Sequence, residues 1–201
     1  MQDTSVAILV AFISSVTTLI AIWLRNYLEK RSTKIGNPFA YNAKYRKITE
    51  ILEEIRLEIG ATRVSLFEFH NGGKLYSGQS EQKMSMKAET MEEHRPHLLK
   101  DYQGLSVAIF DRNLKHLEKN PYYIEHNEQQ YNDTLTILNR IAGINMTATF
   151  RIDSGYVSNN INLPLGVVVV SFAYPVVLAP SQIQHIQERM PILHSAITKV
   201  V

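Results

Sequence analysis

The chain has 201 residues, with 21 Lys or Arg and 19 Asp or Glu, so its formal net charge is only +2. Much of this excess lies in one cluster near the N-terminus, and no basic stripe remains that could follow the phosphates of a nucleic acid. The sequence contains no cysteine, which excludes a thiol nucleophile and leaves the redox compartment open.

The segment from Val6 to Leu24 contains no charged residue, no Pro and no Gly. As a helix of about 19 residues it nearly matches a hydrocarbon core of about 30 Å, and Trp23 falls at headgroup depth. A cleaved signal peptide would need a basic start and a small-residue cleavage site, which the flanks lack. We expect a retained transmembrane helix over 6–24, after a tail of 1–5 and before a basic juxtamembrane linker of 25–40.

The charges beside this segment predict its orientation. The following residues include four cations and one anion: Arg25, Lys30, Arg31 and Lys34, opposed by Glu29. Because Lys and Arg close to a membrane favour the cytoplasmic side, we expect a single-pass protein of a bacterial inner membrane. The lipid bilayer is then one partner, and the domain from residue 41 to 201 lies in the cytoplasm. About 160 residues suffice for one domain with a real core.

Hydrophobic spacing predicts an α+β domain. Apolar residues recur at steps of three and four from Tyr41 to Ile59, which indicates a helix ended by Gly60. Two strands should follow at 63–70 and 83–90, joined by a loop over 71–82. In the second strand Met84, Met86 and Ala88 should share the buried face, with Lys83, Ser85, Lys87 and Glu89 opposite.

The remaining chain continues this alternation of elements. Residues 105–110 could form a short strand, and 112–119 and 125–141 have helical patterns, the second with Leu135, Leu138 and either Ile141 or Ala142 inward. Residues 145–152 alternate as a strand, and the apolar run 165–172 indicates a central strand. A last helix begins near Pro180, with Pro191 inside it expected to bend it.

This order of elements resembles the GAF-like architecture of the GAF/PAS superfamily. The resemblance depends on the first helix running into Gly60-Ala-Thr-Arg-Val-Ser-Leu-Phe and on the late Pro164-Leu-Gly-Val-Val-Val-Val-Ser-Phe. The turn Phe69-His70-Asn71-Gly72-Gly73 is also similar to one in GAF-like proteins of bacteria and their phages. The resemblance implies an antiparallel sheet with both terminal helices on one face and a ligand pocket on the other.

Candidate ligand-binding residues lie at the end of the first strand and on the second. His70, Asn71, Gly72 and Gly73 could bring an imidazole, a carboxamide and free backbone amides to a polar molecule, or could form a purely structural turn. Ser85 and Glu89 could face the same pocket, although a solvated face is the simpler interpretation for that side of the strand. No cofactor can be named.

The sequence gives no positive sign of catalysis. His94 and His97, preceded by Glu92 and Glu93, are metal-ligand types, but Pro96 breaks the helical geometry that would align the imidazoles. The spacing of Gly72, Gly73 and Lys74 is not that of a phosphate-binding loop, and no Gly-x-Ser-x-Gly elbow occurs. We therefore expect no metal site and no enzymatic activity.

Two classes of function remain. The first is a membrane-anchored sensory or regulatory module that binds a small ligand or a protein partner, with no output domain in these 201 residues. The alternative is a phage holin-type lysis protein, in which a single transmembrane helix precedes a periplasmic α/β domain. A degenerate GAF domain that acts only as a dimeric scaffold is a variant of the first class.

A parallel homodimer through the two terminal helices is also expected. Each helix carries more apolar residues than one sheet face can cover, and tethering in a membrane raises the effective concentration. The residues proposed for the interface are Tyr45, Ile48, Ile51, Leu52, Ile55, Met190 and Ile197.

Membrane topology separates the two classes of function. A fluorescent protein fused to the C-terminus should fluoresce and an alkaline phosphatase fusion should be inactive, because the basic flank keeps the domain in the cytoplasm. An active phosphatase fusion with a dark fluorescent fusion would favour the holin.

Overall fold

The computed structural model describes residues 20, 22, 38–74, 80–126, 134–158 and 161–198. The proposed transmembrane segment and its basic linker therefore lie almost wholly outside the described residues. Among the residues that the structure describes, no helix is long and apolar enough to cross a membrane. Residues 40–201 form one compact unit, and the account below concerns that unit.

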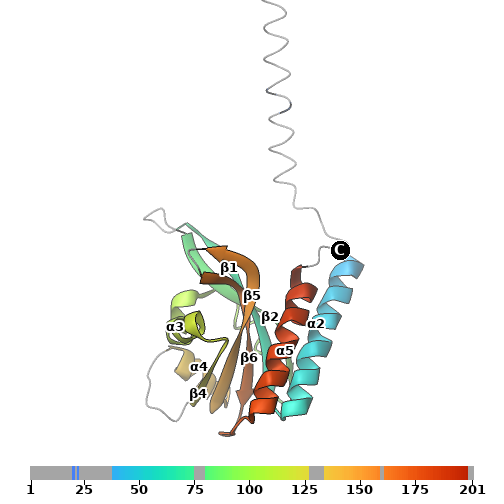
Figure 1. Cartoon of the computed structure of the whole chain (residues 1–201), viewed down its shortest axis with the longest axis vertical. Coiled ribbons are helices and arrows are strands. Elements are labelled where there is room, and N and C mark those ends of the chain that lie inside the picture. The colour runs from blue at the N-terminus through green and yellow to red at the C-terminus, as the bar shows by residue number, and fades with distance from the viewer. Residues whose placement is uncertain are drawn as a thin grey trace, which may run out of the picture. The chain divides into compact units, whose positions relative to one another are not determined.

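The unit is an antiparallel six-stranded sheet with helices on both faces (Figure 1). In chain order its elements are α2 (Pro38–Ile59), β1 (Arg63–Lys74), β2 (Ser80–Met91), β3 (Leu105–Ser106), the 3-10 helix η1 (Val107–Phe110), α3 (Asp111–Lys119), β4 (Tyr122–His126), α4 (Thr134–Ile141), β5 (Met146–Ser158), β6 (Ile161–Phe172) and α5 (Pro180–Thr198). The strand order is β3-β2-β1-β6-β5-β4, which places the apolar β6 centrally, as expected.

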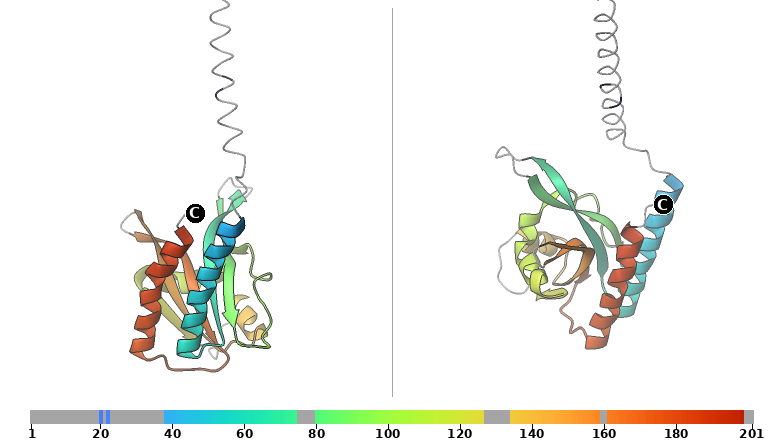
Figure 2. Two further views of the ribbon diagram at one scale, coloured as in Figure 1. Left: turned by 90° about the vertical axis from the view of Figure 1, so that its right-hand side faces the viewer. Right: turned by 45° about the horizontal axis from the view of Figure 1, so that its top comes forward.

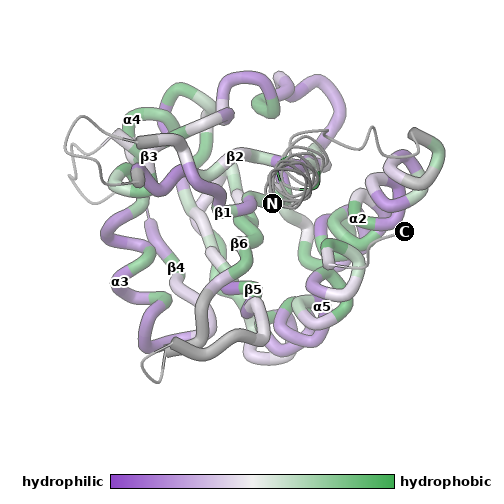
Figure 3. The backbone as a smooth tube through the Cα atoms, turned by 90° about the horizontal axis from the view of Figure 1, so that it is seen from above, coloured by the Kyte–Doolittle hydropathy of each residue, from purple (hydrophilic) through white to green (hydrophobic). Residues whose placement is uncertain are grey.

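Both terminal helices cover the same face of the sheet. Figure 2 shows α2 and α5 side by side on this face, and Figure 3 shows α3 and α4 beyond the other. The helix α2 ends as its sequence predicts: Gly60 has φ +66°, and the amide of Ala61 donates to the carbonyl of Arg56 at 3.0 Å. This is a Schellman cap, and it turns the chain directly into β1.

Two hydrophobic clusters, one on each face, form the core. The larger lies under α2 and α5 and includes Val64, Leu66, Ala148, Phe150 and Val170. The smaller lies on the opposite face, and its members are Phe67, Met84, Met86, Tyr102, Phe110, Leu117, Leu135 and Val167. Successive strand residues point to opposite faces, so β1, β5 and β6 contribute to the helix-covered core with one set of side chains and to the other face with the alternate set.

The proposed interface residues on the terminal helices are occupied inside the chain. Exposed fractions are 8% or less for Ile48, Ile51, Leu52, Ile55, Met190 and Ile197, and Tyr45 packs against the same core. The expectation that Ile51 is a surplus apolar residue is wrong, because one sheet face and the facing helix together bury it. These side chains are not available to a second copy, and the homodimer stays a prediction without an interface.

The helix expected over 125–141 is wrong in its first part. Tyr122–His126 forms β4 and pairs with Phe150–Met146 of β5, so Glu125 lies in a strand. Helix α4 begins only at Thr134, and Leu135 is buried while Ile141 is 79% exposed. Pairing with a neighbouring strand overrides the weak helical periodicity of this segment.

The first two strands also differ from expectation. They continue through 71–74 and 80–82, so the Asn71-Gly72-Gly73 segment is an irregular part of the ladder and not the turn. Leu66 of β1 pairs with Ala88 of β2, but the next residue, Phe67, pairs with Met86, which leaves Lys87 unpaired. This bulge turns Ala88 toward the helices, whereas Met84 and Met86 face the other side. Of residues 105–110, only Leu105 and Ser106 are strand, and η1 follows.

We predict that Gly166 is required for β1 and β6 to pair. A Cβ atom at this position would overlap the backbone carbonyl oxygen of Phe67, which cannot move without separating the strands. Gly166→Ala should lower the free energy of unfolding by about 3 kcal/mol, measured by urea denaturation of the full chain in detergent.

Gly72→Ala is the matched control, because its Cβ would meet only the flexible side chain of Lys83. It should cost less than about 1 kcal/mol. Equal losses of unfolding free energy in Gly166→Ala and Gly72→Ala would show that the close backbone contact at Gly166 is not what requires a glycine there.

Candidate functional site

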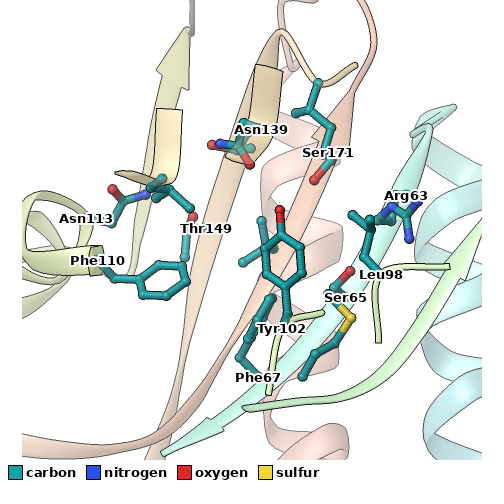
Figure 4. Close-up of a pocket in the computed structure, with 15 residues that line it drawn as sticks. Arg63, Ser65, Phe67, Leu98, Tyr102, Phe110, Asn113, Asn139, Thr149 and Ser171 are labelled. Carbon is teal, nitrogen blue, oxygen red and sulfur yellow. The ribbon is translucent and has the colours of Figure 1, made fainter. Parts of the chain in front are cut away.

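A cavity of about 30 Å³ lies on the face of the sheet opposite α2 and α5. Figure 4 shows its wall, which combines strands of the sheet with η1, α3, α4 and the irregular chain before β3. The apolar lining consists of Phe67, Met86, Leu98, Phe110, Leu135, Ile144 and Val169. The polar lining consists of Arg63, Ser65, Tyr102, Asn113, Asn139, Thr147, Thr149 and Ser171.

Strand alternation places hydroxyl groups in this wall. Ser65 lies between the helix-facing Val64 and Leu66 of β1, and Thr147 and Thr149 flank Ala148 of β5. Small polar side chains on these strands therefore face the cavity while their neighbours fill the larger core. The exposed fractions of Ser65, Thr147 and Thr149 are 2%, 2% and 4%.

Three buried polar atoms of the lining have no hydrogen-bond partner among the described residues. They are Ser65 Oγ, Asn113 Oδ1 and Thr147 Oγ1, from β1, α3 and β5 respectively. Leaving a buried donor or acceptor unpaired costs about 1–3 kcal/mol, so proteins rarely do so without a reason. Three such atoms lie around this one cavity, where a bound polar group or water could pair with them.

A buried ion pair forms one end of the cavity. Arg63 on β1 and Glu89 on β2 contact each other, and the exposed fractions of their side chains are 4% and 3%. Burial lowers the pKa of the Arg63 guanidinium below its ordinary value, although the nearby Glu89 carboxylate opposes this shift. The pair places the Arg63 guanidinium in the cavity wall. The Glu89 carboxylate, which does not line the cavity, balances its charge.

Glu89 also holds the chain that covers the cavity. We call residues 96–104, which carry Leu98 and Tyr102, the cover segment. The backbone amides of Leu98 and Leu99 each donate to Glu89 Oε1 at 3.0 Å. Arg63 donates to the carbonyl of Pro96. The start of the cover segment is thus fixed by one carboxylate and its paired guanidinium.

The other end of the cover segment is fixed by β2. The amide of Met86 donates to the carbonyl of Tyr102 at 2.8 Å, and the amide of Gly104 donates to Ser85 Oγ at 2.8 Å. Tyr102 is 6% exposed, and burial raises the pKa of its phenol above the ordinary value, with Arg63 opposing the shift. Its hydroxyl stays neutral near pH 7 and is directed among the lining residues (Figure 4).

Helices α3 and α4 are positioned by a second ion pair, which is partly buried. Arg112 of α3 contacts Glu125 of β4, which is 4% exposed, and lies 3.5 Å from Thr136 Oγ1 of α4. Asn113 of α3 and Asn139 of α4 line the cavity and are 4% and 5% exposed.

The candidate residues at the end of β1 are not in the cavity lining. His70 is exposed, and its Nε2 lies 2.8 Å from Ser85 Oγ. Asn71 is exposed and accepts a hydrogen bond from Gln82 at 3.0 Å. Gly73 has φ +94°, which a glycine adopts without strain. The positive φ of the irregular ladder accounts for Gly73, whereas Gly72 has no such backbone requirement and adjoins the Lys83 side chain.

Ser85 and Glu89 are buried, at 6% and 8% exposure, and the expected solvated face is wrong for both. For Glu89 the bulge at Lys87 is the reason, because it reverses which side of β2 faces the cavity after residue 87. Ser85 precedes the bulge, and its hydroxyl is held by the Gly104 amide and His70 Nε2. Neither residue lines the cavity, but each fixes one end of the cover segment. Within the described ranges, no group of three His, Asp or Glu side chains could hold a metal ion, and this includes His94 and His97.

Sequence reasoning missed the residues that do line the cavity. The signal for Ser65, Thr147, Thr149 and Ser171 was present, since each is a small hydroxyl residue inside an otherwise apolar strand. No comparable signal marks Asn113 and Asn139, because Asn in a helix is usually exposed.

Comparison with known proteins identifies the fold. No protein-family profile and no curated protein sequence matches the chain. Among solved structures, the phycocyanobilin-bound GAF domain of a cyanobacterial phytochrome matches with a TM-score of 0.57 and 17% identity, over 77% of this chain and 84% of that one.

Two further solved structures give the same result. A far-red cyanobacteriochrome has a TM-score of 0.56 and 12% identity over 90% of this chain and 97% of its own. The PixJ GAF domain of Thermosynechococcus elongatus has a TM-score of 0.52 and 13% identity, over 79% of this chain and 92% of its own. The chain has a GAF-like fold. At these identities the likeness concerns the fold alone.

We predict that Glu89 stabilises both the sheet and the cover segment. Glu89→Gln should lower the free energy of unfolding by about 3–5 kcal/mol, because Arg63 would remain buried without its counter-charge. Hydrogen exchange of the Leu98 and Leu99 amides should accelerate as well. Urea denaturation and exchange mass spectrometry of the full chain measure the two effects.

Glu50→Gln is the control, because the Arg46–Glu50 pair is 77% and 64% exposed and exposed pairs contribute little. A similar loss of unfolding free energy in Glu89→Gln and Glu50→Gln would show that burial of the Arg63–Glu89 pair does not increase its contribution to stability.

Proposed function

We propose that residues 40–201 form a regulatory module that binds a small molecule in the cavity between the sheet and the cover segment. The observation that carries this proposal is the set of three buried, unpartnered polar atoms in the cavity wall. A concave site with an apolar lining and a few polar groups is the usual form of a small-molecule site. The GAF-like fold supports the proposal, since the similar structures named above include sensory domains.

The bilin named for one of these structures is not proposed as the ligand here. A cavity of about 30 Å³ has room for about two water-sized groups. A chromophore with many rings would require the wall to rearrange. The chain also has no cysteine to which a ligand could be linked through sulfur. We propose a reversible ligand and binding without catalysis.

The sheet offers a direct connection between ligand and helices. Ser65 and Thr147 face the cavity, and their neighbours Val64, Leu66 and Ala148 pack in the core beneath α2 and α5. A change in strand position on ligand binding would therefore reach both helices through close-packed side chains. We further propose that residues 6–24 anchor the chain in a bacterial inner membrane, with this domain in the cytoplasm and its signal passed to a partner protein.

Native mass spectrometry of the full chain, released from detergent, tests the binding proposal. The wild-type chain should carry a bound small molecule after purification or after incubation with a metabolite extract. Ser65→Val should lose it, because the added methyl groups occupy the cavity and remove the hydroxyl. Thermal unfolding by circular dichroism would confirm that the variant is folded.

The double variant His70→Ala/Asn71→Ala is the control and should keep the bound molecule. The opposite pattern would place the site at the end of β1, where the sequence suggested it. A wild-type chain that never carries an adduct would contradict the proposal.

A further inference from the structure

The cavity wall restricts the charge of what it can bind. Among the lining residues, Arg63 alone carries a formal charge at neutral pH, and the Glu89 carboxylate already balances it. An anion or a cation would add a net charge to a space where the wall holds no free counter-ion. Burying such an unpaired charge is costly. The raised pKa of Tyr102 agrees, since its phenolate is disfavoured in the same place.

The unpartnered atoms restrict the hydrogen bonds of the ligand. Asn113 Oδ1 is an acceptor and requires a donor from the ligand. The hydroxyls of Ser65 and Thr147 can each donate and accept, so at least one ligand acceptor can also be used. A molecule without a donor would leave Asn113 Oδ1 buried and unpaired.

Size and apolar walls complete the description. The volume allows a body of a few heavy atoms, and Phe67 and Phe110 border it with rings whose centroids lie 5.9 Å apart. We propose that the cavity selects a compact, uncharged molecule, or an uncharged terminal group of a larger one, that both donates and accepts hydrogen bonds. A primary amide is one chemical type that meets these requirements. This inference rests on the proposed function, because it names the ligand class of the same site.

Four probes of equal heavy-atom number test this selection on the full chain in detergent. They are acetamide, acetone, acetate and acetamidinium, which differ in charge and in hydrogen-bond donors but hardly in shape. The readout is the methyl NMR signal of Met86, which lines the cavity, in protein labelled at the methionine methyl groups. Met190, in the core under the helices, is the internal control. Met86→Leu and Met190→Leu assign the two signals.

Acetamide should shift the Met86 signal, with millimolar affinity for so small a probe, and leave Met190 unchanged. Acetone should bind about ten-fold more weakly, because it cannot donate to Asn113 Oδ1. Acetate and acetamidinium should be weaker by at least about ten-fold. Thr147→Val, which keeps the side-chain shape, should weaken acetamide binding about five-fold without altering the Met190 signal.

Two results would overturn the inference. Acetate or acetamidinium binding as tightly as acetamide would show that the wall tolerates charge, while leaving a small-molecule cavity in place. If none of the four probes shifts Met86, then water alone meets the unpartnered atoms. The proposed function is judged separately, by whether Ser65→Val removes the molecule that native mass spectrometry detects.

Discussion

The buried ion pair between Arg63 and Glu89 connects the sheet to everything that covers the cavity. Its two side chains come from neighbouring strands, and Glu89 then receives the backbone amides of Leu98 and Leu99. Without this carboxylate, the cover segment would have to satisfy its amides elsewhere, and a guanidinium would lie buried alone. The closure of the cavity therefore depends on a charge interaction inside a mostly apolar domain.

The two faces of the sheet perform different tasks because their side chains differ. The face under α2 and α5 is lined by aliphatic and aromatic residues that are almost fully buried, and it supplies most of the core. The opposite face is crossed by short elements and irregular chain, and several hydroxyl and amide groups lie among its buried apolar residues. The sheet therefore carries an apolar face and a more polar face, and the cavity lies on the polar one.

The bulge in β2 shows how one residue can redirect a site. In a regular strand Glu89 would lie on the face opposite to that of Met86, which is the face covered by the helices. The unpaired Lys87 reverses this arrangement, so Glu89 reaches Arg63 beside the cavity. Simple alternation therefore places Glu89 on the wrong face, whereas Ser85, before the bulge, lies on the expected face; both residues hold the cover segment.

Much of the architecture follows from the sequence by itself. The seam of α2, its Gly60 cap, the alternation of β5 and the apolar run of β6 are local patterns, and local patterns report which face of an element is buried. They were enough to predict the GAF-like order of helices and strands. The position of the cavity was decided only by the tertiary structure, because Ser65, Asn113 and Thr147 come from β1, α3 and β5 and meet only after the chain has folded. The bulge at Lys87 and the strand at 122–126, whose last two residues fall in the helix expected over 125–141, have the same cause: each depends on a pairing partner distant in sequence, which no local pattern contains.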